Sequence, residues 1–233
     1  MAKVTDLNAV KRVAIQFLHL DPKPIPELPF FINHPYFESR QLPSVNNRNK
    51  FFDILEDRDE YNLYCKSIED RILNGDIYTI FALMLTKYQL TFLKYTKEYM
   101  SKKDFETLLA HVWVASENPN QDSNVKIRTL ISWFKQANKK YLMEPDELEY
   151  YNNLPSQVKV YRGVAVGRAK AEGLSWTCNY NTAEWFANRF GGGGYVLCGI
   201  IDKADVFAYF NRRGEDEVLC NSSKVRVINS NGR

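Results

Sequence analysis

Hydrophobic residues follow a helical spacing through the middle of the chain. Between Phe51 and Asn153 they recur at every third or fourth position, as on one side of a helix. The two stripes with this spacing are Ile127, Ile131, Phe134, Asn138 and Tyr141, and Ile80, Leu83 and Lys87. The helix breaks are expected at Asn74-Gly75, Asn118-Pro119 and Glu144-Pro145. The pattern predicts a helical lobe over residues 51–153.

Short strand-like runs replace this spacing after Leu154-Pro155. The runs are Val158 to Tyr161, Leu174 to Thr177, Tyr195 to Ile201, Val206 to Phe210, Glu217 to Cys220 and Val225 to Ile228. One short helix is expected between the second and third runs, from Asn181 to Phe190, with Asn181 as N-cap and Glu184 as its capping-box partner. The apolar face of that helix is Ala183, Phe186, Ala187 and Phe190. Helices followed by strands predict an α+β fold.

Prolines are concentrated near the start of the chain. Six of them fall between Asp21 and Pro43, where they fix φ and remove backbone donors. This segment is predicted to be an extended arm that serves as a linker or docks a partner. The predicted organisation is therefore an N-terminal segment over 1–50, a helical lobe over 51–153 and a β-rich core over 154–233, with 51–233 forming one domain.

Composition indicates a globular protein. The 233 residues are 45% hydrophobic and 25% charged, which excludes a disordered or low-complexity chain. The longest apolar stretch, Ile77 to Leu85, is too short to span a membrane, and the run Val13 to Leu20 lacks a secretory cleavage pattern. We therefore expect a soluble protein of the cytoplasm, or of a host cytoplasm after delivery, without a membrane partner.

Cysteine and histidine are sparse and scattered. The four cysteines and three histidines show no metal-ligand spacing, so reduced thiols and no bound metal are expected. The net charge of +3 comes from residues 161–233, which carry 10 basic and 7 acidic side chains, whereas residues 1–160 carry 21 of each. This excess suits an anionic ligand and is too small for a strong duplex binder.

Three short motifs in the strand-rich part carry candidate chemistry. They are Val160-Tyr161-Arg162-Gly163, Ser175-Trp176-Thr177 and Glu215-Asp216-Glu217. Each alone has an ordinary explanation, as a surface arginine, a cross-strand hydroxyl pair or the polar face of an edge strand. Together, in this order, they resemble the arginine–serine–glutamate class of ADP-ribosyltransferases, which includes actin-modifying binary toxins and phage or bacterial mono-ADP-ribosyltransferases.

The resemblance also covers residues between the motifs. Trp185-Phe186-Ala187 with Arg189, and the stretch from Ala208-Tyr209 to Leu219, resemble that family, so the similarity extends over residues 155–228. It implies a helical N-terminal lobe followed by a compact ADP-ribosyltransferase-like mixed β core. Two departures are the 12 residues that separate Arg162 from Ser175, which leave no room for intervening helices, and Trp176 in place of a small residue.

The family's chemistry assigns roles to the two glutamates. Cleavage of the nicotinamide bond of NAD gives an oxocarbenium-like ribose, and a carboxylate near the 2′-hydroxyl stabilises that charge. Glu217 is expected in this role. Glu215, two residues earlier, is expected on the same strand face, where it would orient the nucleophile, and paired carboxylates suit an arginine acceptor.

The resemblance also implies an NAD-binding set. Its members are Arg162, Gly163, Ser175, Thr177, Phe186 and Arg189, with Arg162 and Ser175 also counted as catalytic. Phe186 would lie against nicotinamide, or simply pack in the core. The glycines from Gly191 to Gly194 fit a loop beside the NAD pocket or a plain helix C-cap, and no Walker or Rossmann motif is present.

The loop before the glutamates is expected to meet the acceptor. Tyr209, Phe210, Arg212 and Arg213 would present an exposed aromatic and two cations to an acidic protein surface or to nucleic acid, unless the loop is an ordinary turn.

The predicted function is a mono-ADP-ribosyltransferase that uses NAD as co-substrate and releases nicotinamide, with protein arginine as the expected acceptor. One alternative is modification of an RNA or DNA base by a toxin of a defence or toxin–antitoxin system, with an antitoxin or regulator as a further partner. The second alternative is a non-catalytic NAD- or partner-binding module.

Overall fold

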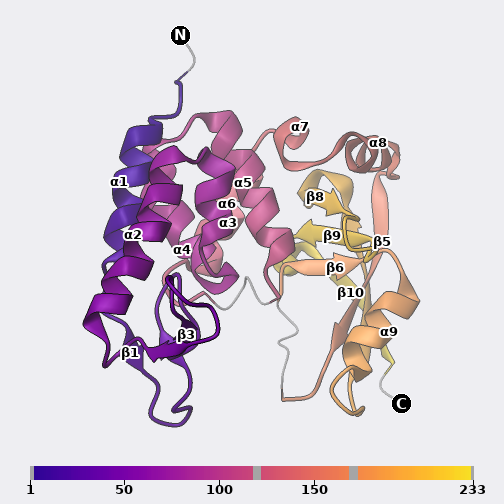
Figure 1. Cartoon of the computed structure of the whole chain (residues 1–233). Helices are drawn as coiled ribbons and strands as arrows, with labels where there is room; N and C mark the ends of the chain where they lie inside the picture. Colours follow the sequence, from indigo (N-terminus) through magenta and orange to yellow (C-terminus); the bar gives the residue numbers. More distant parts are fainter. Residues whose placement is uncertain (1–2, 118–121, 168–172, 232–233) are drawn as a thin grey trace. The chain divides into compact units, whose positions relative to one another are not determined.

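The computed structural model describes residues 3–117, 122–167 and 173–231 (Figure 1). The chain divides into two units, residues 1–124 and 125–233. The sequence placed a boundary at 153/154, whereas the helices between residues 125 and 153 group with the sheet that follows them. The predicted break at Asn118-Pro119 lies outside the described residues.

The first unit contains five α-helices in its described residues. They are α1 (Leu7–Leu18), α2 (Arg58–Asn74), α3 (Ile77–Leu83), α4 (Thr86–Thr96) and α5 (Lys102–Ala115). Asp6, Asp57, Asp76 and Ser101 cap α1, α2, α3 and α5 by accepting hydrogen bonds from backbone amides of the first turn. The predicted break at Asn74-Gly75 is confirmed, because α2 ends there.

One predicted stripe of this unit is divided between two helices. The sequence grouped Ile80, Leu83 and Lys87, but α3 ends at Leu83 and α4 begins at Thr86. The buried residues of α3 are Ile77, Ile80 and Phe81. Similarly, Phe51–Asp53, placed in the helical lobe, forms the short strand β4.

The proline-rich segment is not an extended arm. It folds back into two strand pairs, β1 (Lys23–Pro24) with β2 (Ile32–Asn33), and β3 (Gln41–Pro43) with β4. His34 and Tyr36 are buried and hydrogen-bond to α1, with His34 Nε2 3.2 Å from the Leu18 carbonyl and the Tyr36 hydroxyl 3.0 Å from that of Ala14. The apolar residues between the prolines bury themselves, and this outweighs the tendency of proline to keep a chain extended.

Three helices precede the sheet of the second unit: α6 (Ile127–Gln136), α7 (Lys139–Leu142) and α8 (Pro145–Asn153). The predicted stripe is displaced, because α6 buries Leu130, Trp133 and Phe134 while Ile127 is 40% exposed. The predicted break at Glu144-Pro145 is confirmed as the start of α8, where Glu144 and Glu147 form a capping box.

A six-stranded antiparallel sheet follows these helices in the second unit, and the combination of helices and sheet confirms the predicted α+β class. Its strands are β5 (Gln157–Val164), β6 (Ser175–Thr177), β7 (Tyr195–Asp202), β8 (Val206–Phe210), β9 (Glu217–Cys220) and β10 (Arg226–Asn231). All six predicted runs are confirmed, with small shifts at their ends. The order across the sheet is β10-β7-β5-β6-β9-β8, which is 6-3-1-2-5-4 when these strands are counted from one along the chain. Neighbouring strands of the described sheet are antiparallel, where the sequence predicted a mixed core.

Helix α9 (Tyr180–Asn188) lies against β5 and β7 of this sheet, with Ala183 and Ala187 packed on Val196 and Tyr161. The predicted N-cap is wrong by two residues: the cap is Asn179, whose side chain accepts hydrogen bonds from the Asn181 and Thr182 amides. Phe190 follows the helix and is 55% exposed, so it is not part of the buried face. Among the described helices of both units, none is long and apolar enough to cross a membrane.

Candidate active site

The three sequence motifs lie on three neighbouring strands of the sheet. β5 carries Arg162, β6 is the Ser-x-Thr motif, and β9 begins at Glu217. Thr177 of β6 is paired with Tyr161 on one side and with Glu217 on the other. Tyr161 and Glu217, which are 56 positions apart in the sequence, therefore lie in one row across the sheet.

Glu217 is a buried carboxylate. Its residue is 5% exposed, and its side chain shares a face of the sheet with Thr177 and Tyr161 because cross-strand partners point the same way. The buried Cys220 thiol nearby has a pKa raised to about 12, mainly by burial, and the charge of Arg162 opposes that rise while the charges of Asp205 and Glu217 add to it. The guanidinium and the carboxylate therefore act on the same interior atom.

Thr177 connects the second motif to the third. Its hydroxyl donates a hydrogen bond to the backbone carbonyl of Glu215 over 2.7 Å and accepts one from the Asn179 amide over 3.0 Å. Ser175 is instead paired with Leu219. Of the two hydroxyl residues of this motif, Thr177 is thus the one opposite Glu217, whereas Ser175, which the resemblance counts as catalytic, is opposite Leu219.

Arg162 occupies the place where β5 and β6 separate. The described register between these two strands consists of the pair Tyr161 and Thr177. The Arg162 guanidinium donates to the Ser175 carbonyl and lies against Gly173, where a Cβ would come within 2.0 Å of the guanidinium Nη2 atom. Side chains alternate between the two faces of a strand, so the Arg162 side chain lies on the face opposite to Tyr161 and Glu217. There its guanidinium binds the backbone of the second motif.

Gly163 also has a packing role. A Cβ on it would lie 2.1 Å from the Ala183 carbonyl oxygen and 2.6 Å from the Ala187 amide, both in the backbone of α9. The absence of a side chain therefore lets α9 approach β5 closely. This contact explains the glycine without any ligand.

Glu215 is not on the strand face with Glu217. The strand begins at Glu217, and Asp216 between the two glutamates has φ 47°, a left-handed conformation that interrupts the alternation of side chains. The Glu215 carboxylate pairs with Arg213 Nη2 at 2.7 Å, and its side chain is 24% exposed. The expectation of two carboxylates aligned on one strand was wrong, because the motif spans a turn.

Asp216 holds this turn in place. Its carboxylate accepts a hydrogen bond from the Tyr209 hydroxyl over 2.6 Å and a longer one from Asn179 Nδ2 over 3.4 Å. Its amide donates to Asn211 Oδ1 over 3.1 Å, and its carbonyl accepts from the Cys178 amide over 3.0 Å. The ends of β6 and β8 are thereby fixed to the segment that carries both glutamates.

Two tyrosines and a cysteine surround Asp216. Tyr150 of α8 stacks on Tyr209 with 4.1 Å between ring centroids. Burial, together with the Asp216 hydrogen bond, raises the pKa of Tyr209, and burial followed by the charge of Asp216 raises the pKa of Cys178 to about 11. Tyr209 and Cys178 therefore stay protonated near neutral pH, and the Tyr209 hydroxyl is the donor of its hydrogen bond to the Asp216 carboxylate.

The loop predicted to meet an acceptor is largely structural. Tyr209 and Phe210 are 3% and 2% exposed, so neither is the exposed aromatic that the sequence suggested. Arg212 pairs with the buried Glu147 at 3.2 Å and donates to the Leu142 carbonyl over 2.9 Å. The two arginines remain exposed, Arg213 more than Arg212, with 39% and 25% of their side chains accessible.

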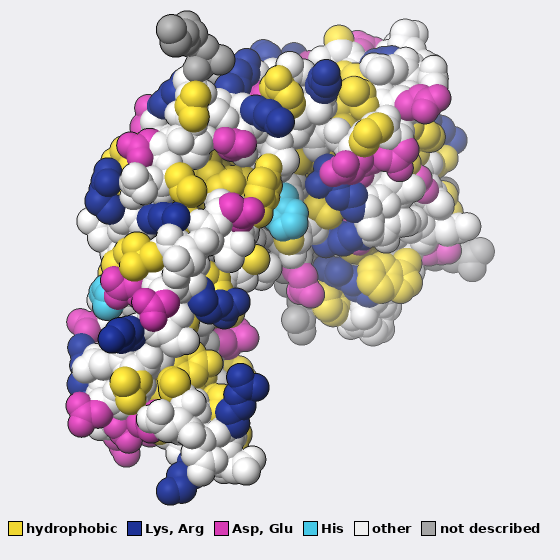
Figure 2. Space-filling model, turned by 45° about the horizontal axis from the view of Figure 1, so that its top comes forward, with side chains coloured by type: hydrophobic (Ala, Val, Ile, Leu, Met, Phe, Trp, Pro, Cys, Tyr) yellow, Lys and Arg dark blue, Asp and Glu magenta, His cyan; other side chains and the backbone are white. Residues whose placement is uncertain are grey.

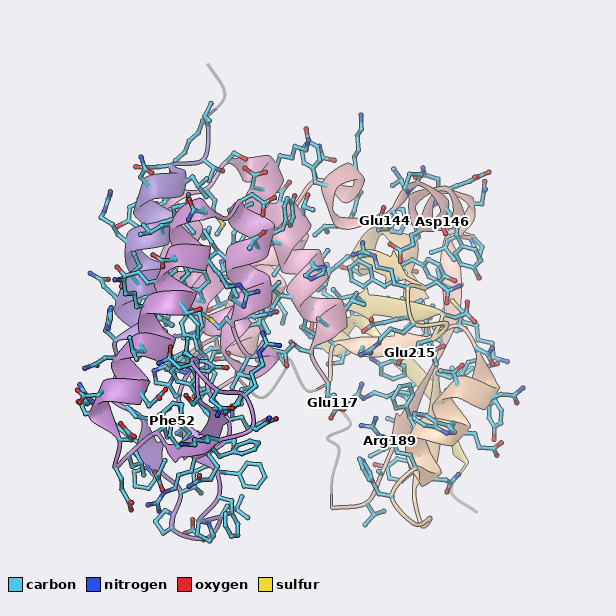
Figure 3. All side chains as sticks on the ribbon, in the orientation of Figure 1. Phe52, Glu117, Glu144, Asp146, Arg189 and Glu215 are labelled. Atoms are coloured by element: carbon cyan, nitrogen blue, oxygen red, sulfur yellow. The ribbon has the colours of Figure 1, made fainter. Side chains whose placement is uncertain are left out.

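The C-terminal end of α9 carries a cation among aromatic rings. The Arg189 guanidinium lies 4.9 Å from the ring centroid of Phe186 and 4.6 Å from that of Phe190, while Trp185 is 59% exposed beside them. Figure 3 shows Arg189 at α9 and Glu215 near the strands. Phe186 is half-buried, which fits either a ring on the helix flank or a ring against a ligand.

The glycines after α9 adopt conformations that other residues avoid. Gly191, Gly192 and Gly193 have φ values of 103°, 88° and 80°, and a Cβ on any of them would meet no described atom within 4 Å. Gly194 is different, because a Cβ there would lie 2.0 Å from the Ala187 carbonyl oxygen. The first three glycines are thus in open positions, whereas Gly194 packs against the backbone of α9 just before β7 begins.

Sequence reasoning missed the residues that build the turn. These are Asn179 and Asn211, together with Tyr209 and Asp216, which the sequence had placed in an acceptor loop and in the third motif without this structural role. The sequence offered one signal for the turn, the run Gly214-Glu215-Asp216 in a segment rich in turn-forming residues.

Charges of both signs occur on the face that Figure 2 presents. Over most of it Lys and Arg side chains are interspersed with Asp and Glu, and one group of Lys and Arg side chains lies close together on the right. Within the described ranges, no group of three or more His, Cys, Asp or Glu side chains could hold a metal ion, and the four cysteines are free thiols. Comparisons with family models, curated proteins and solved structures found no match to this chain.

Proposed function

We propose that this chain is an NAD-dependent mono-ADP-ribosyltransferase that modifies an arginine of an acceptor protein and releases nicotinamide. The observation that carries the proposal is the row Tyr161–Thr177–Glu217, which joins the three motifs on adjacent strands. The row places the buried Glu217 and Thr177 beside Tyr161, although Tyr161 and Glu217 are 56 positions apart in the sequence.

Glu217 is the group proposed to drive cleavage of NAD. The bond between C1′ of the ribose and nicotinamide breaks with positive charge developing on the sugar. A carboxylate in a site that is 5% exposed acts on that charge through a medium with little water, where its effect is larger than in solution. Its position is fixed by its pairing with Thr177 and Phe210 on the two neighbouring strands.

Glu215 is proposed to bind the acceptor guanidinium. Its carboxylate is partly exposed on a turn, and it holds the guanidinium of Arg213 at 2.7 Å, which supports its ability to bind this chemical group. Burial of Tyr209 and Phe210 removes the aromatic rings that would stack on a nucleic-acid base. Protein arginine is therefore preferred over an RNA or DNA base.

Arg189 and its aromatic neighbours are proposed to bind the anionic half of NAD. Arg189 is the exposed C-cap residue of α9, and after Phe190 it is followed by glycines whose backbone is open to an approaching ligand. Stacking on Phe186 and Phe190 holds its planar guanidinium, so less side-chain freedom is lost when it binds a phosphate. Arg162 would contribute by holding Ser175 and the start of β6 in place.

The deciding experiment compares the purified wild-type protein with Glu217→Gln and with the exposed-residue control Glu149→Gln. Each is incubated with NAD labelled in its adenylate part and with cell extract, and the protein and nucleic-acid fractions are separated before and after RNase treatment. Label and nicotinamide release that need Glu217 but not Glu149 would support the transferase.

Other outcomes point to the alternatives. Glu217-dependent label in the nucleic-acid fraction would replace the protein acceptor with an RNA or DNA base. Neither label nor nicotinamide from wild type would contradict the transferase and favour the binding module, which equilibrium dialysis with NAD would then test.

A further inference from the structure

The guanidinium of Arg213 contacts the Glu215 carboxylate, the group that we propose binds the acceptor arginine. Its Nη2 atom is 2.7 Å from Glu215 Oε2, within the distance of a charge-assisted hydrogen bond. The two residues are separated by Gly214, whose φ of 67° turns the chain so that the side chains meet. A guanidinium of the chain itself thus occupies the position that an acceptor arginine would take.

The neighbouring arginine is held quite differently. Arg212 is fixed by the buried Glu147, by Glu144 and by the Leu142 carbonyl. Arg213 has Glu215 as its recorded polar partner, and 39% of its side chain is exposed. Of these two adjacent guanidinium groups, Arg213 alone could leave its partner and form a new covalent bond without breaking a buried ion pair.

The turn also keeps Arg213 near the cleavage site. Glu215 is fixed through its carbonyl by Thr177, and Thr177 is paired with Glu217. A nucleophile attached to the same turn competes with acceptors in solution at a high effective concentration. The geometry points to Arg213 as a site of self-ADP-ribosylation, an inference that rests on the proposed function.

The reaction balances with NAD as the other reactant. The bond from ribose C1′ to the nicotinamide nitrogen breaks, and nicotinamide leaves with the bonding electron pair. A guanidinium nitrogen of Arg213 forms the new bond to C1′ and loses one proton, first to the Glu215 carboxylate and then to water. The products are ADP-ribosyl-Arg213, nicotinamide and one proton.

Modification would also change the acceptor site. It attaches a bulky group with two phosphates to the guanidinium that lies on Glu215. The guanidinium keeps its charge, but the added phosphates repel the carboxylate and the added bulk covers it. A modified molecule should therefore transfer less ADP-ribose to other proteins, so that the activity limits itself.

The test uses the full chain incubated with labelled NAD and no other protein, followed by peptide mapping by mass spectrometry. The variants are Arg213→Gln, Arg213→Lys and a control, Arg226→Gln, an exposed arginine on the strand at the far edge of the sheet. We expect label on the peptide containing Arg213, and a loss of about tenfold or more in total label in both Arg213 variants. Arg226→Gln should keep the wild-type label, and the labelled fraction per molecule should not depend on protein concentration.

Nicotinamide release, measured in the same samples, separates the two hypotheses. One possible result is that nicotinamide release depends on Glu217, while Arg213 carries no label or the total label is unchanged in Arg213→Gln and Arg213→Lys. This result would overturn self-modification but not the transferase activity. Absence of release from wild type would overturn both. Circular dichroism of the variants checks that the exposed turn has not altered the fold.

Discussion

The hydroxyl of Tyr209 donates a hydrogen bond to Asp216 Oδ1 over 2.6 Å. Tyr209 is at the end of β8 and is 3% exposed, whereas Asp216 is in the turn before β9 with φ 47°. A left-handed Asp costs free energy that its surroundings must offset, and this bond is the shortest of those that hold it. The pair therefore links the sheet's edge strand to the conformation of the turn between Glu215 and Glu217.

Removal of that hydroxyl should loosen the turn. Tyr209→Phe keeps the ring stacked on Tyr150 but deprives a carboxylate of its closest donor. We expect a loss of about 1–3 kcal/mol in the free energy of unfolding, measured with urea. Transfer of ADP-ribose should fall more than hydrolysis of NAD, because Glu215 is on the turn and Glu217 is in the strand.

Tyr180→Phe is the matched control for this variant. Tyr180 is 42% exposed at the start of α9 and packs edge-on against Tyr161. Loss of its hydroxyl should change neither stability nor the ratio of transfer to hydrolysis. Equal behaviour of the two variants would mean that the Tyr209 hydroxyl does not position the turn.

Arg212 and Glu147 should be strongly coupled. Glu147 is 2% exposed and accepts from the Asn211 amide, the Glu144 amide and Arg212. Arg212→Ala leaves this buried carboxylate without its cation, which should lower the free energy of unfolding by about 3 kcal/mol. Arg212→Ala/Glu147→Gln should be more stable than Arg212→Ala alone, and strictly additive effects in this double-mutant cycle would contradict the pairing.

Gly163 should tolerate no side chain. In Gly163→Ala the new Cβ would lie 2.1 Å from the Ala183 carbonyl oxygen, so α9 must move away from β5. The expected loss of stability is about 1–3 kcal/mol, by analogy with overpacked cores. In Gly214→Ala the Cβ meets no described atom within 4 Å, so only the φ of 67° carries a cost, about 1 kcal/mol. A Gly163→Ala protein as stable as wild type in thermal unfolding would refute the close approach.

Strands were easier to predict than the turn between them. The six runs are rich in β-branched, aromatic and other apolar residues, which gave them a clear signal. Two of them, β8 and β9, are buried along their whole length. The turn at Asp216 depends instead on bonds to Tyr209 and Cys178, which are distant or on another strand. Alternation along the sequence cannot reveal a positive φ, so Glu215 was assigned to a strand that begins two residues later.

The prediction of an extended proline-rich arm was wrong for a related reason. Its prolines suggested an extended chain, but the free energy from burying Ile32, Tyr36 and Phe37 decides the conformation. The partners of these residues are on α1 and α2, and sequence spacing alone did not indicate that they would meet. Similarly, Tyr209 and Phe210 were predicted to be exposed because a polar turn follows them in the sequence. They are buried because they belong to β8, whose five residues all pack in the interior.

His34 should make the first unit sensitive to mild acid. The ring is 1% exposed and stacks on Phe37 at 4.6 Å. Its Nε2 donates to the Leu18 carbonyl, and its Nδ1 accepts from the Tyr36 amide. Protonation of Nδ1 would place a proton against that amide in a buried site, and burial accordingly lowers the pKa of His34 from 6.5 to about 4.

The sign of the effect follows from proton binding. Between pH 6.5 and pH 4 the unfolded chain binds a proton at His34 that the folded chain does not, so the free energy of unfolding decreases as the pH falls through this window. This residue should contribute a slope of about 1.4 kcal/mol per pH unit in the middle of the window. His34→Gln should show a shallower dependence in urea unfolding at several pH values, whereas the exposed-residue control His111→Gln should keep the wild-type slope. The same slope in His34→Gln and wild type would show that His34 is protonated equally in the folded and unfolded chains.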